Sequence, residues 1–434
     1  MSIRRVIIVL MFLLFMFGTA SSQVTAIKAG HLVDPETGKA VSNQVILIEE
    51  GRIKEIGKNV SIPSDATVVD LSGSYVLPGL VDAHDHLTLT YKRVPENNNY
   101  YLTTIMDSSP LRAVQGFSMG FQKLAYGFTV VRDVGNCGNY SDTALRQAID
   151  QGWVPGPTII NSGLIISGKG GQFWPNAERE DLVYPEYLEA DTRDEIIKAV
   201  RKNALFGAKV IKIMVDAKPW GYTVDELKLF VEEATKCRLK VAGHVQTPDG
   251  CKRAIEAGIW SLEHGNAMND EIHKMMAAKG IWRVGTDTPY REGSRYSKER
   301  WEQRIPAKIK NAYENKVLMA FGTDACYYIP GQNRGELTID FLKSWKAAGV
   351  PDAEILKIMT TNGYKVCDIY DRRGPIKVGL PADIIAVKDN PLKDIDALRN
   401  VTFVMKDGLV FKNNGIVAPM AFFNGGPAKG WRRR

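Results

Sequence analysis

Histidine is rare in this chain, with six among 434 residues, yet His84 and His86 lie two positions apart in the segment "VDAHDHL". The residues before this pair are apolar, which predicts a buried strand. Side chains at positions i and i+2 of a strand point to the same face, so the two imidazoles would project together. Two such imidazoles can bind one metal ion, although the same spacing also fits a polar loop after a strand. The pair alone leaves both interpretations open.

Other residues able to bind metals also follow short apolar segments. His244 comes after "LKVAG", His264 after "IWSLE" and Asp324 after "VLMAFGT". Lys212 lies inside the apolar segment "AKVIKIMV", where an ammonium group without a partner would be costly to bury. Residues of types that can bind metal ions are therefore found at or just after several predicted strands.

From Pro78 onward, short apolar segments alternate with amphipathic ones such as "TVDELKLFVEEATKCR". The expected strands lie at 80–83, 129–132, 158–161, 210–214, 240–243, 261–263, 282–284 and 318–322. Eight strand–helix alternations predict an α/β fold, specifically a parallel (β/α)₈ (TIM) barrel. The carboxyl ends of such strands form the mouth of the barrel, so the residues above are expected to meet there.

Short alternating segments with turn residues at Glu50-Gly51 and Ser72-Gly73 precede the barrel, and the strand pattern returns after about Arg373. Strands at both ends of the chain predict one small β-sandwich domain. We expect this discontinuous domain to comprise residues 23–77 and 373–434, and the catalytic barrel to span 78–372.

The first residues have the features of a secretory signal peptide. Arg4 and Arg5 precede an apolar run at 6–17, and small residues follow it. The run is short for a membrane span. We expect residues 1–22 to be a signal peptide cleaved between Ala20 and Gln23. The protein is then secreted or periplasmic and free of the membrane; an uncleaved N-terminal anchor is the alternative.

Composition narrows the classes of partner. The net charge of +7 is mild for this length, the basic tail "KGWRRR" is typical of a solvated terminus, and no nucleic-acid motif is present. Five scattered cysteines without a CxxC pair predict neither a disulfide framework nor a thiolate zinc site. We therefore expect a small-molecule substrate and, as for many soluble enzymes, association into a homo-oligomer.

The order of these segments resembles the amidohydrolase superfamily of metal-dependent hydrolases, and most of all its branch of imidazolonepropionase-like enzymes and Xaa-Pro dipeptidases. The resemblance rests on "VLPGLVDAHDHL", "GFTVVRDVGN", "GAKVIKIM", "LKVAGHV", "AIEAGIWSLEHGN" and "MAFGTDA", with "GPIKVGLPADIIAVKDNPLKDI" near the C-terminus. It covers nearly all of the mature chain, in the right order.

The resemblance implies two divalent ions at the barrel mouth. The ligands would be His84, His86 and Asp324 for one ion, and His244 and His264 for the other. Lys212, carboxylated by CO₂, would bridge both ions. Zinc is the default for an imidazole-rich site without thiolates, and manganese or cobalt could replace it. A hydroxide that bridges the ions would attack the scissile carbonyl, and Asp324 would carry its proton to the leaving amine.

The loops expected to line the pocket depart from the dipeptidase pattern. Gln172 stands where those enzymes often carry a loop histidine, and Ile329-Pro330-Gly331 replaces a later His-Gly. Xaa-Pro specificity therefore stays open. A cation, an amide or a tyrosine hydroxyl could hold the substrate, a role for which the candidates are Lys169, Gln172, Tyr222, Tyr327 and Tyr328.

These features predict a secreted binuclear-metal amidohydrolase that cleaves amide bonds, as a dipeptidase or carboxypeptidase-like enzyme acting on dipeptides or N-acyl amino acids. The alternative substrates are cyclic amides and imidazolones, or esters and lactones. A non-catalytic relative is disfavoured, because such proteins typically lose metal ligands and all six positions are present here.

Overall fold

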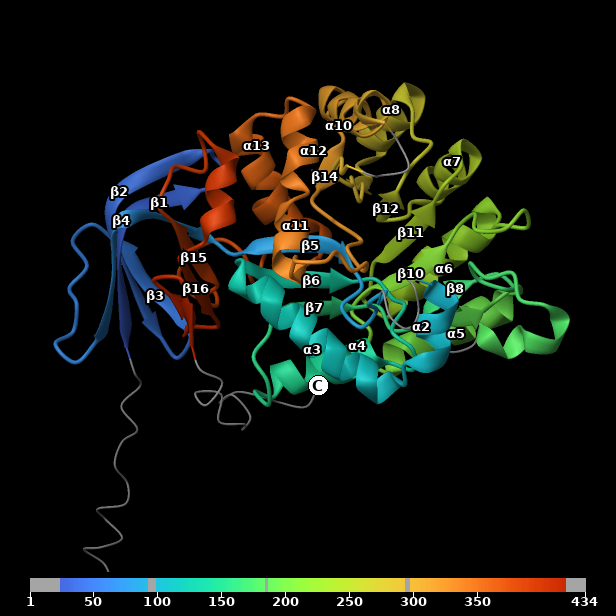
Figure 1. Ribbon diagram of the computed structural model, residues 1–434, viewed down its shortest axis with the longest axis horizontal. Coiled ribbons are helices and arrows are strands. Elements are labelled where there is room, and N and C mark those ends of the chain that lie inside the picture. Colours follow the sequence, from blue (N-terminus) through green and yellow to red (C-terminus); the bar gives the residue numbers. More distant parts are fainter. Residues whose placement is uncertain (1–23, 93–98, 184–185, 293–296, 419–434) are drawn as a thin grey trace, which may run out of the picture.

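The computed structural model describes residues 24–92, 99–183, 186–292 and 297–418. The expected signal peptide and the basic tail lie outside these residues. Figure 1 shows two bodies side by side, a sheet domain at one end and a larger body of strands and helices. No helix in the described part of the chain has the length and apolar character needed to cross a membrane.

One eight-stranded sheet forms the smaller body, in the order β18-β17-β16-β15-β4-β1-β2-β3. Its strands are β1 (Thr25–Asp34), β2 (Lys39–Glu49), β3 (Arg52–Gly57), β4 (Thr67–Pro78), β15 (Ile384–Val387), β16 (Phe403–Lys406), β17 (Leu409–Asn413) and β18 (Ile416–Val417). β4 pairs antiparallel with β15, which joins the two ends of the chain in one sheet. Apolar residues from both ends share its core, among them Ile27, Ile46, Ile384 and Phe403.

One of the two expected turns of this sheet forms a hairpin, and the other does not. Glu50-Gly51 and Asp407-Gly408 have positive φ, which suits tight turns between antiparallel strands. Ser72-Gly73 lies inside β4, so the predicted turn at this position is wrong. The register of β1 with β4 shifts here instead, and a Cβ on Gly30 would lie 2.1 Å from the Ser72 carbonyl oxygen. The turn-like residues therefore mark a bulge, which alternation alone does not distinguish from a turn.

The larger body contains the eight parallel strands of the predicted barrel and two further short strands, β8 and β9. Its strands are β5 (Leu80–Asp85), β6 (Phe128–Asp133), β7 (Thr158–Asn161), β8 (Ile165–Ser167), β9 (Tyr187–Glu189), β10 (Ile211–Met214), β11 (Val241–Val245), β12 (Ser261–His264), β13 (Trp282–Val284) and β14 (Leu318–Ala320). They form sheets β5-β6-β7 and β14-β13-β12-β11-β10-β8-β9. Backbone bonds from Ala83 N to Phe321 O (2.8 Å) and from Lys209 N to Asn161 O (2.7 Å) close these sheets into one barrel. The predicted fold class is confirmed.

Helices cover the outside of the barrel strands (Figure 1). They are α2 (Tyr100–Met106), α3 (Ser109–Ala125), α4 (Ser141–Asp150), α5 (Arg193–Leu205), α6 (Val224–Lys236), α7 (Pro248–Ala257), α8 (Asp270–Lys279), α9 (Lys298–Glu302), α10 (Ile305–Glu314), α11 (Arg334–Ile339), α12 (Leu342–Ala347), α13 (Asp352–Lys357) and α14 (Gly363–Val366). Short 3₁₀ helices lie at Ala177–Leu182 and Ile395–Asn400, and a π-helical turn lies at Ile358–Asn362. Thr192 and Thr223 begin α5 and α6 with capping boxes, which satisfy the free N–H groups of the first turn.

The parallel register brings the ends of neighbouring strands to one level. Met214 of β10 pairs with His244 of β11, and Val245 of β11 pairs with His264 of β12. Because parallel strands all run the same way, the residues at their carboxyl ends gather at one mouth. Histidines that are far apart in the sequence therefore lie around a single opening.

Candidate metal centre

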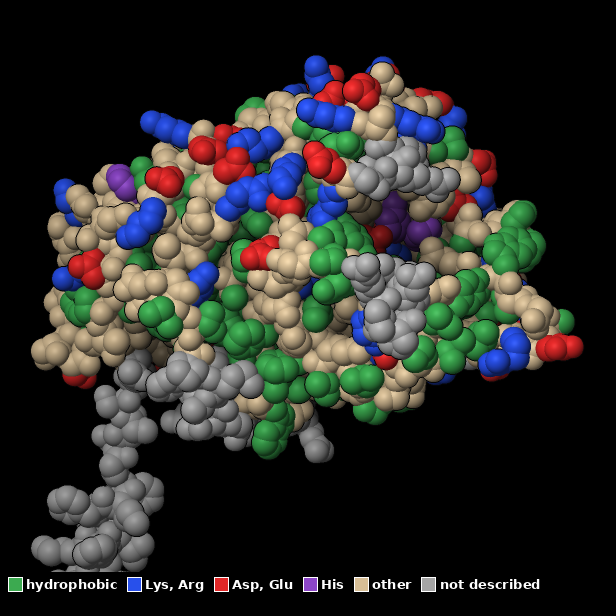
Figure 2. All heavy atoms as spheres, viewed as in Figure 1, with side chains coloured by type: hydrophobic (Ala, Val, Ile, Leu, Met, Phe, Trp, Pro, Cys, Tyr) green, Lys and Arg blue, Asp and Glu red, His purple; other side chains and the backbone are tan. Residues whose placement is uncertain are grey.

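A cavity of about 260 Å³ lies at the carboxyl ends of the barrel strands. Predicted metal-site residues that line it are His86, Lys212, His244, His264 and Asp324. His84 is fully buried beside them, with its ring 5.4 Å from that of His86 and 4.6 Å from that of His264. Figure 2 shows histidine side chains within a hollow on this face of the molecule. The structure therefore brings all six predicted side chains together.

The end of β5 and the loop after β14 supply the tightest group of potential ligands. One nitrogen each of His84 and His86 and one oxygen of Asp324 lie within 4.8 Å of one another. His86 Nε2 is 3.1 Å from Asp324 Oδ1. The backbone N–H of Asp324 also donates to the His84 carbonyl at 2.8 Å, which ties the last strand to the first.

The first two imidazoles each have one nitrogen held by the protein. His84 Nδ1 lies 2.7 Å from Glu263 Oε2, and His86 Nδ1 lies 2.8 Å from the carbonyl oxygen of Gly135. Such contacts fix the orientation of a ring and direct its other nitrogen elsewhere. Nε2 of His84 is left without a partner among the described residues, whereas Nε2 of His86 faces Asp324 Oδ1.

The other two imidazoles are oriented in a similar way. His264 Nδ1 lies 3.0 Å from the hydroxyl of Thr286, and His244 Nε2 lies 3.2 Å from the side-chain amide of Gln246. Their rings are in contact, with centroids 4.4 Å apart. Each of these two rings therefore keeps its other nitrogen, Nδ1 of His244 and Nε2 of His264, as a candidate metal ligand.

Two buried nitrogens at this site have no hydrogen-bond partner among the described residues. They are Lys212 Nζ and His84 Nε2. Buried polar atoms are nearly always paired, so each unpaired atom calls for an explanation. Burial lowers the pKa of Lys212 to about 8, although the nearby carboxylates of Glu263 and Asp324 oppose this shift.

Burial also controls the charge of the imidazoles. It lowers the pKa of His84 and His264 well below their usual range, and that of His244 to about 3. For His86, burial again lowers the pKa, but the hydrogen bond and the charge of Asp324 outweigh it and the pKa is raised. Three of the rings are thus neutral near pH 7, the form of imidazole that binds metal ions.

A buried ion pair that the sequence analysis missed supports His84. Arg132 Nη2 donates to both oxygens of Glu263, at 2.8 and 2.9 Å, and the Ser261 hydroxyl donates to Glu263 Oε1 at 2.6 Å. The available signal was a charged residue inside each of two apolar strands, "TVVRD" and "WSLEH". The same reasoning that singled out Lys212 applies to Arg132 and Glu263.

Several residues at the mouth have left-handed backbone conformations. His264 has φ 64°, Thr286 φ 46° and Asp324 φ 54°. Positive φ is unusual for any residue other than glycine and is a clear outlier for a β-branched one such as Thr286. Strained backbone of this kind concentrates at functional sites, where the surrounding structure enforces it.

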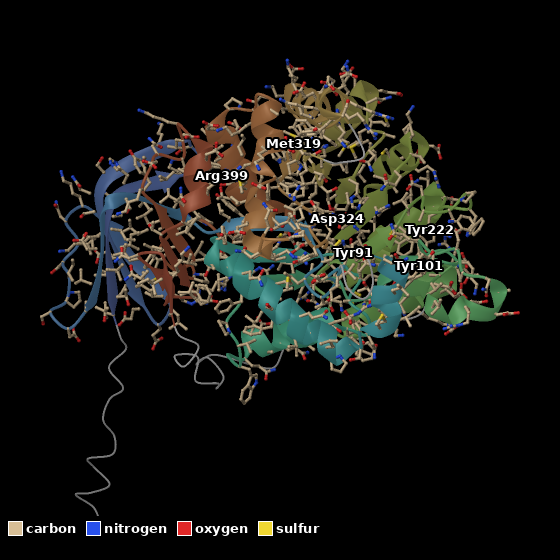
Figure 3. All side chains as sticks on the ribbon, in the orientation of Figure 1. Tyr91, Tyr101, Tyr222, Met319, Asp324 and Arg399 are labelled. Atoms are coloured by element: carbon tan, nitrogen blue, oxygen red, sulfur yellow. The ribbon has the colours of Figure 1, made fainter. Side chains whose placement is uncertain are left out.

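Two of the predicted substrate-binding residues, Gln172 and Tyr327, line the cavity. The Tyr327 hydroxyl is buried and has no hydrogen-bond partner among the described residues. Tyr91 and Asn136 also line the cavity and were not anticipated. Figure 3 labels Tyr91 near Asp324, and the backbone of Tyr91 bridges to that of Tyr327.

The other three candidates lie elsewhere. Tyr222 is buried in the core, where its hydroxyl donates to the carbonyl of Ala190 at 3.0 Å. The Lys169 ammonium forms ion pairs with Glu180 and Glu189. Tyr328, next to Tyr327, is 46% exposed and lies outside the lining of the cavity.

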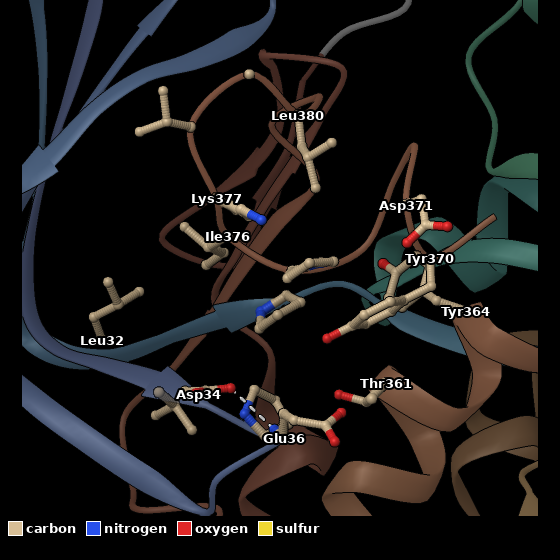
Figure 4. Close-up of a pocket in the computed structure, with 16 residues that line it drawn as sticks. Leu32, Asp34, Glu36, Thr361, Tyr364, Tyr370, Asp371, Ile376, Lys377 and Leu380 are labelled. Carbon is tan, nitrogen blue, oxygen red and sulfur yellow. Dashed lines mark hydrogen bonds between the residues drawn. The ribbon is translucent and has the colours of Figure 1, made fainter.

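A larger cavity of about 650 Å³ lies between the sheet domain and the barrel, and Figure 4 shows its lining. It includes the carboxylates of Asp34, Glu36 and Asp371, and Glu36 is paired with Lys365 at 3.0 Å. Among the described residues that line it there is no histidine. The size of a cavity alone therefore does not identify the candidate active site, because the potential metal ligands lie around the smaller cavity.

A family model described as "Amidohydrolase family" matches residues 75–410. The chain therefore belongs to the amidohydrolase family, whose members generally bind divalent metal ions. It is a hydrolase that acts on carbon–nitrogen bonds.

Known relatives match over most of the chain. An ochratoxinase of Aspergillus niger is 29% identical over 446 aligned residues, which cover 92% of this chain and 88% of that protein. An imidazolonepropionase of Alkaliphilus metalliredigens is 25% identical and covers 89% of this chain and 92% of its own. The crystal structure of an Xaa-Pro dipeptidase with methionine bound in its active site has 30% sequence identity and a TM-score of 0.77, covering 90% of this chain and 100% of that one.

Proposed function

We propose that this protein is a binuclear-metal amidohydrolase that cleaves the amide bond of dipeptides or N-acyl amino acids. The observation that carries the proposal is the buried amine of Lys212, which has no partner among the described residues and lines the same cavity as three imidazoles and Asp324. The relatives that act as a dipeptidase and an ochratoxinase support an amide substrate.

The residues fit a pair of divalent ions. His84, His86 and Asp324 would hold one ion, and His244 and His264 the other. Lys212 would bridge both as a carbamate, because a lysine with a lowered pKa is more often neutral and a neutral amine can add CO₂. The imidazole-rich donor set without thiolates favours zinc, with manganese or cobalt as substitutes. The bound ions would polarise the carbonyl and make water a stronger acid.

Asp324 is the residue that would move the proton. One oxygen lies 3.1 Å from His86 Nε2 and the other 3.8 Å from His264 Nδ1, so the carboxylate lies between the two halves of the site. Its side chain is partly exposed and lines the cavity. Asp324 could therefore take a proton from the attacking water and give it to the leaving amine. Glu263 would hold His84 in its orientation during this transfer.

Substrate groups would contact the remaining lining of the cavity. The Gln172 amide and the Tyr327 hydroxyl can hydrogen-bond to peptide or carboxylate oxygens. The relative that acts as an imidazolonepropionase favours a second candidate, a cyclic amide at the same site.

The test is hydrolysis by purified protein loaded with zinc, manganese or cobalt, with metal content measured by mass spectrometry. We expect two ions per chain and turnover of dipeptides or N-acyl amino acids, with cyclic amides, esters and lactones as comparison substrates. Protein that binds no metal and hydrolyses none of these compounds would disprove the proposal.

We also propose that the N-terminal segment directs export and is removed. Its order of Arg4 and Arg5, an apolar run and small residues supports this. Sequencing of the N-terminus of the exported protein should find a start between Ala20 and Gln23. A mature protein that retains Arg4 would instead indicate an anchor.

A further inference from the structure

A buried ion pair lies behind the wall of the metal cavity. Arg112 of α3 and Glu186, which comes just before β9, are 1% and 0% exposed. Arg112 Nη1 donates to Glu186 Oε1, and Arg112 Nη2 lies 3.5 Å from the carbonyl oxygen of Thr103 on α2. Neither charged residue lines the metal cavity. Because burying two charges costs solvation free energy, their hydrogen-bond partners indicate what the pair supports.

An unbroken series of hydrogen bonds leads from this pair to the metal cavity. The side chain of Asn136, after β6, bonds to Glu186, and its amide nitrogen donates to the Tyr100 hydroxyl. A further hydrogen bond joins the hydroxyls of Tyr100 and Tyr187. The Tyr187 hydroxyl donates to Gln172 Oε1 at 2.8 Å, and Gln172 lines the metal cavity. Glu186 is thus connected to a side chain at the candidate active site.

Glu186 sets the direction of every bond in this series. An ionised carboxylate only accepts hydrogen bonds, so Asn136 must present its NH₂ group to Glu186 and to Tyr100. Because the Tyr100 oxygen accepts from Asn136, its proton is free to go to Tyr187, whose own proton goes to Gln172 Oε1. The NH₂ group of Gln172 is therefore the end of the amide that is left for the cavity. The nitrogen and oxygen of an amide have similar shapes, and it is this series that distinguishes them.

The charge states of these residues keep the series in one direction. Burial raises the pKa of Glu186, whereas the charge and the hydrogen bond of Arg112 oppose this rise and favour the carboxylate. Burial also raises the pKa of Tyr100 and of Tyr187, so both hydroxyls keep their protons and remain donors. Hydrogen bonds in a series polarise one another, which makes such a series stiffer than its separate bonds.

Packing fixes the ring of Tyr187 beside the loop that carries Gln172. The centroid of this ring lies 5.7 Å from that of Phe173, at an interplanar angle of 85°, and the Phe173 ring lies 4.8 Å from that of Tyr100. Gly171 has φ 54°, and a Cβ there would lie 2.7 Å from the Tyr187 ring, so the loop needs glycine to pass this close. The Tyr187 hydroxyl therefore has a defined position relative to the exposed side chain of Gln172.

We propose that Tyr187 is a positioning residue, which holds the Gln172 amide so that its NH₂ group donates to an oxygen of the bound substrate. The proposal rests on the amide hydrolysis proposed above. Tyr187 does not line the metal cavity, so it acts on the substrate only through Gln172. Without the tyrosine hydroxyl the amide is free to rotate, and its oxygen then meets the substrate oxygen, where no hydrogen bond can form.

The test measures hydrolysis of N-acetyl-L-alanine and L-alanyl-L-alanine by metal-loaded protein. Tyr187→Phe removes only the hydroxyl, and we expect kcat/KM to fall about tenfold, mainly through a higher KM. In protein that carries Gln172→Ala, the same Tyr187→Phe change should alter kcat/KM less than about twofold. A fall of equal size in both backgrounds would show that Tyr187 acts through the fold alone and would overturn the proposal.

Tyr140 provides a matched control. Its hydroxyl donates to Asn203 Oδ1 at 2.9 Å, so it makes the same kind of bond to a side-chain amide, but neither residue lines the metal cavity. Tyr140→Phe should leave kcat and KM unchanged, with or without Gln172→Ala. A rise in KM in Tyr140→Phe as large as that in Tyr187→Phe would count against a specific role for Tyr187.

A measurement on the Gln172 amide itself separates this proposal from the proposed function. In protein labelled with ¹⁵N-glutamine and loaded with zinc, the NH₂ signals of Gln172 are identified by their loss in Gln172→Ala. Their order parameter should fall in Tyr187→Phe and stay the same in Tyr140→Phe. This result in protein that hydrolyses no amide would uphold the positioning and refute the proposed function. An order parameter that Tyr187→Phe does not change would overturn the positioning, whatever the activity.

Discussion

The sheet domain and the barrel mouth both contain buried charged side chains, but the two regions differ in whether these side chains have partners within the protein. In the sheet domain, Arg373 pairs with Asp383 at 2.5 Å and with Asp407 at 2.6 Å, and Lys406 pairs with Asp383 at 3.3 Å. Each charge there faces an opposite charge. At the barrel mouth, Lys212 Nζ has no hydrogen-bond partner among the described residues.

The difference separates a structural network from a site that needs a ligand. A buried ion pair stabilises the folded state only when both partners are present, and the sheet domain meets that condition within its own chain. At the barrel mouth, the unpaired nitrogens of Lys212 and His84 gain a partner only when a ligand binds there. Charge burial alone is therefore a poor guide to function, whereas unpaired nitrogens that lie among other potential metal ligands are a better one.

The largest expected effect comes from Lys212→Met compared with Lys406→Met. Lys212→Met removes the group proposed to bridge the metal ions, so activity should fall on the order of 10³-fold or more, with loss of bound metal. Lys406→Met should instead lower the free energy of unfolding by about 3 kcal/mol and keep the activity of the folded molecules. Turnover, metal content and urea denaturation measure these outcomes. Full activity in Lys212→Met would show that the unpaired lysine at the barrel mouth is not needed for function, and would contradict the contrast drawn between the two regions.

Asp324→Asn tests the proton transfer within the mouth. The amide keeps the shape of the carboxylate but does not accept a proton at neutral pH, so turnover should fall about 10² to 10³-fold. Much of the metal should stay bound, because the imidazoles and Lys212 are intact. Steady-state kinetics at matched metal occupancy provide the measurement, and turnover near that of the unmodified protein would refute the role of Asp324.

Glu263→Gln tests a residue that belongs to both categories, because Glu263 forms a buried ion pair with Arg132 and also contacts His84 of the candidate metal site. The variant weakens the contact that orients His84, and metal affinity should fall about 10 to 100-fold. Glu233→Gln is the matched control, because Glu233 is a buried carboxylate on α6 that pairs with Arg201 and Lys236 away from the mouth. Competition with a metal chelator should show weaker binding in the first variant only.

The smallest effect is expected from Asp407→Asn in the sheet domain. Burial would raise the pKa of Asp407, but the charges of Lys406 and Arg373 outweigh it and lower the pKa. A lowered pKa in the folded state stabilises the protein above the ordinary carboxylate pKa, and the contribution is lost as the pH falls below it. Asp407→Asn should therefore cost less than about 1 kcal/mol at pH 7 and reduce the loss of stability in acid. An unchanged acid-unfolding profile would contradict this.

The barrel, and the grouping of the candidate metal ligands at its mouth, could be predicted because local signals were strong. The strands expected at 158–161 and 282–284 have the observed bounds, and buried parallel strands are recognisable as short apolar runs between helices. A polar residue at the end of such a run has one natural position, the mouth of the barrel. His84, His244 and Asp324 could therefore be grouped before their distances were known.

Other features depend on contacts between distant segments and leave little local trace. The bulge at Ser72-Gly73 arises from the close approach of Gly30 on another strand, so the same residues looked like a turn. Tyr222 lies close to Lys212 in sequence, yet its ring packs inward and its hydroxyl bonds to Ala190. Side-chain direction in a loop depends on its tertiary neighbours, which spacing does not specify.

The pairing of β4 with β15 also has a consequence for biosynthesis. Tyr75 lies beside Val387 and Pro78 beside Ile384, so more than three hundred residues must leave the ribosome before the edge of β4 is covered. Until then this edge is open to pairing with other chains. A message cut short within the barrel would yield a product with a permanently open edge, and cellular quality control could recognise it by that defect.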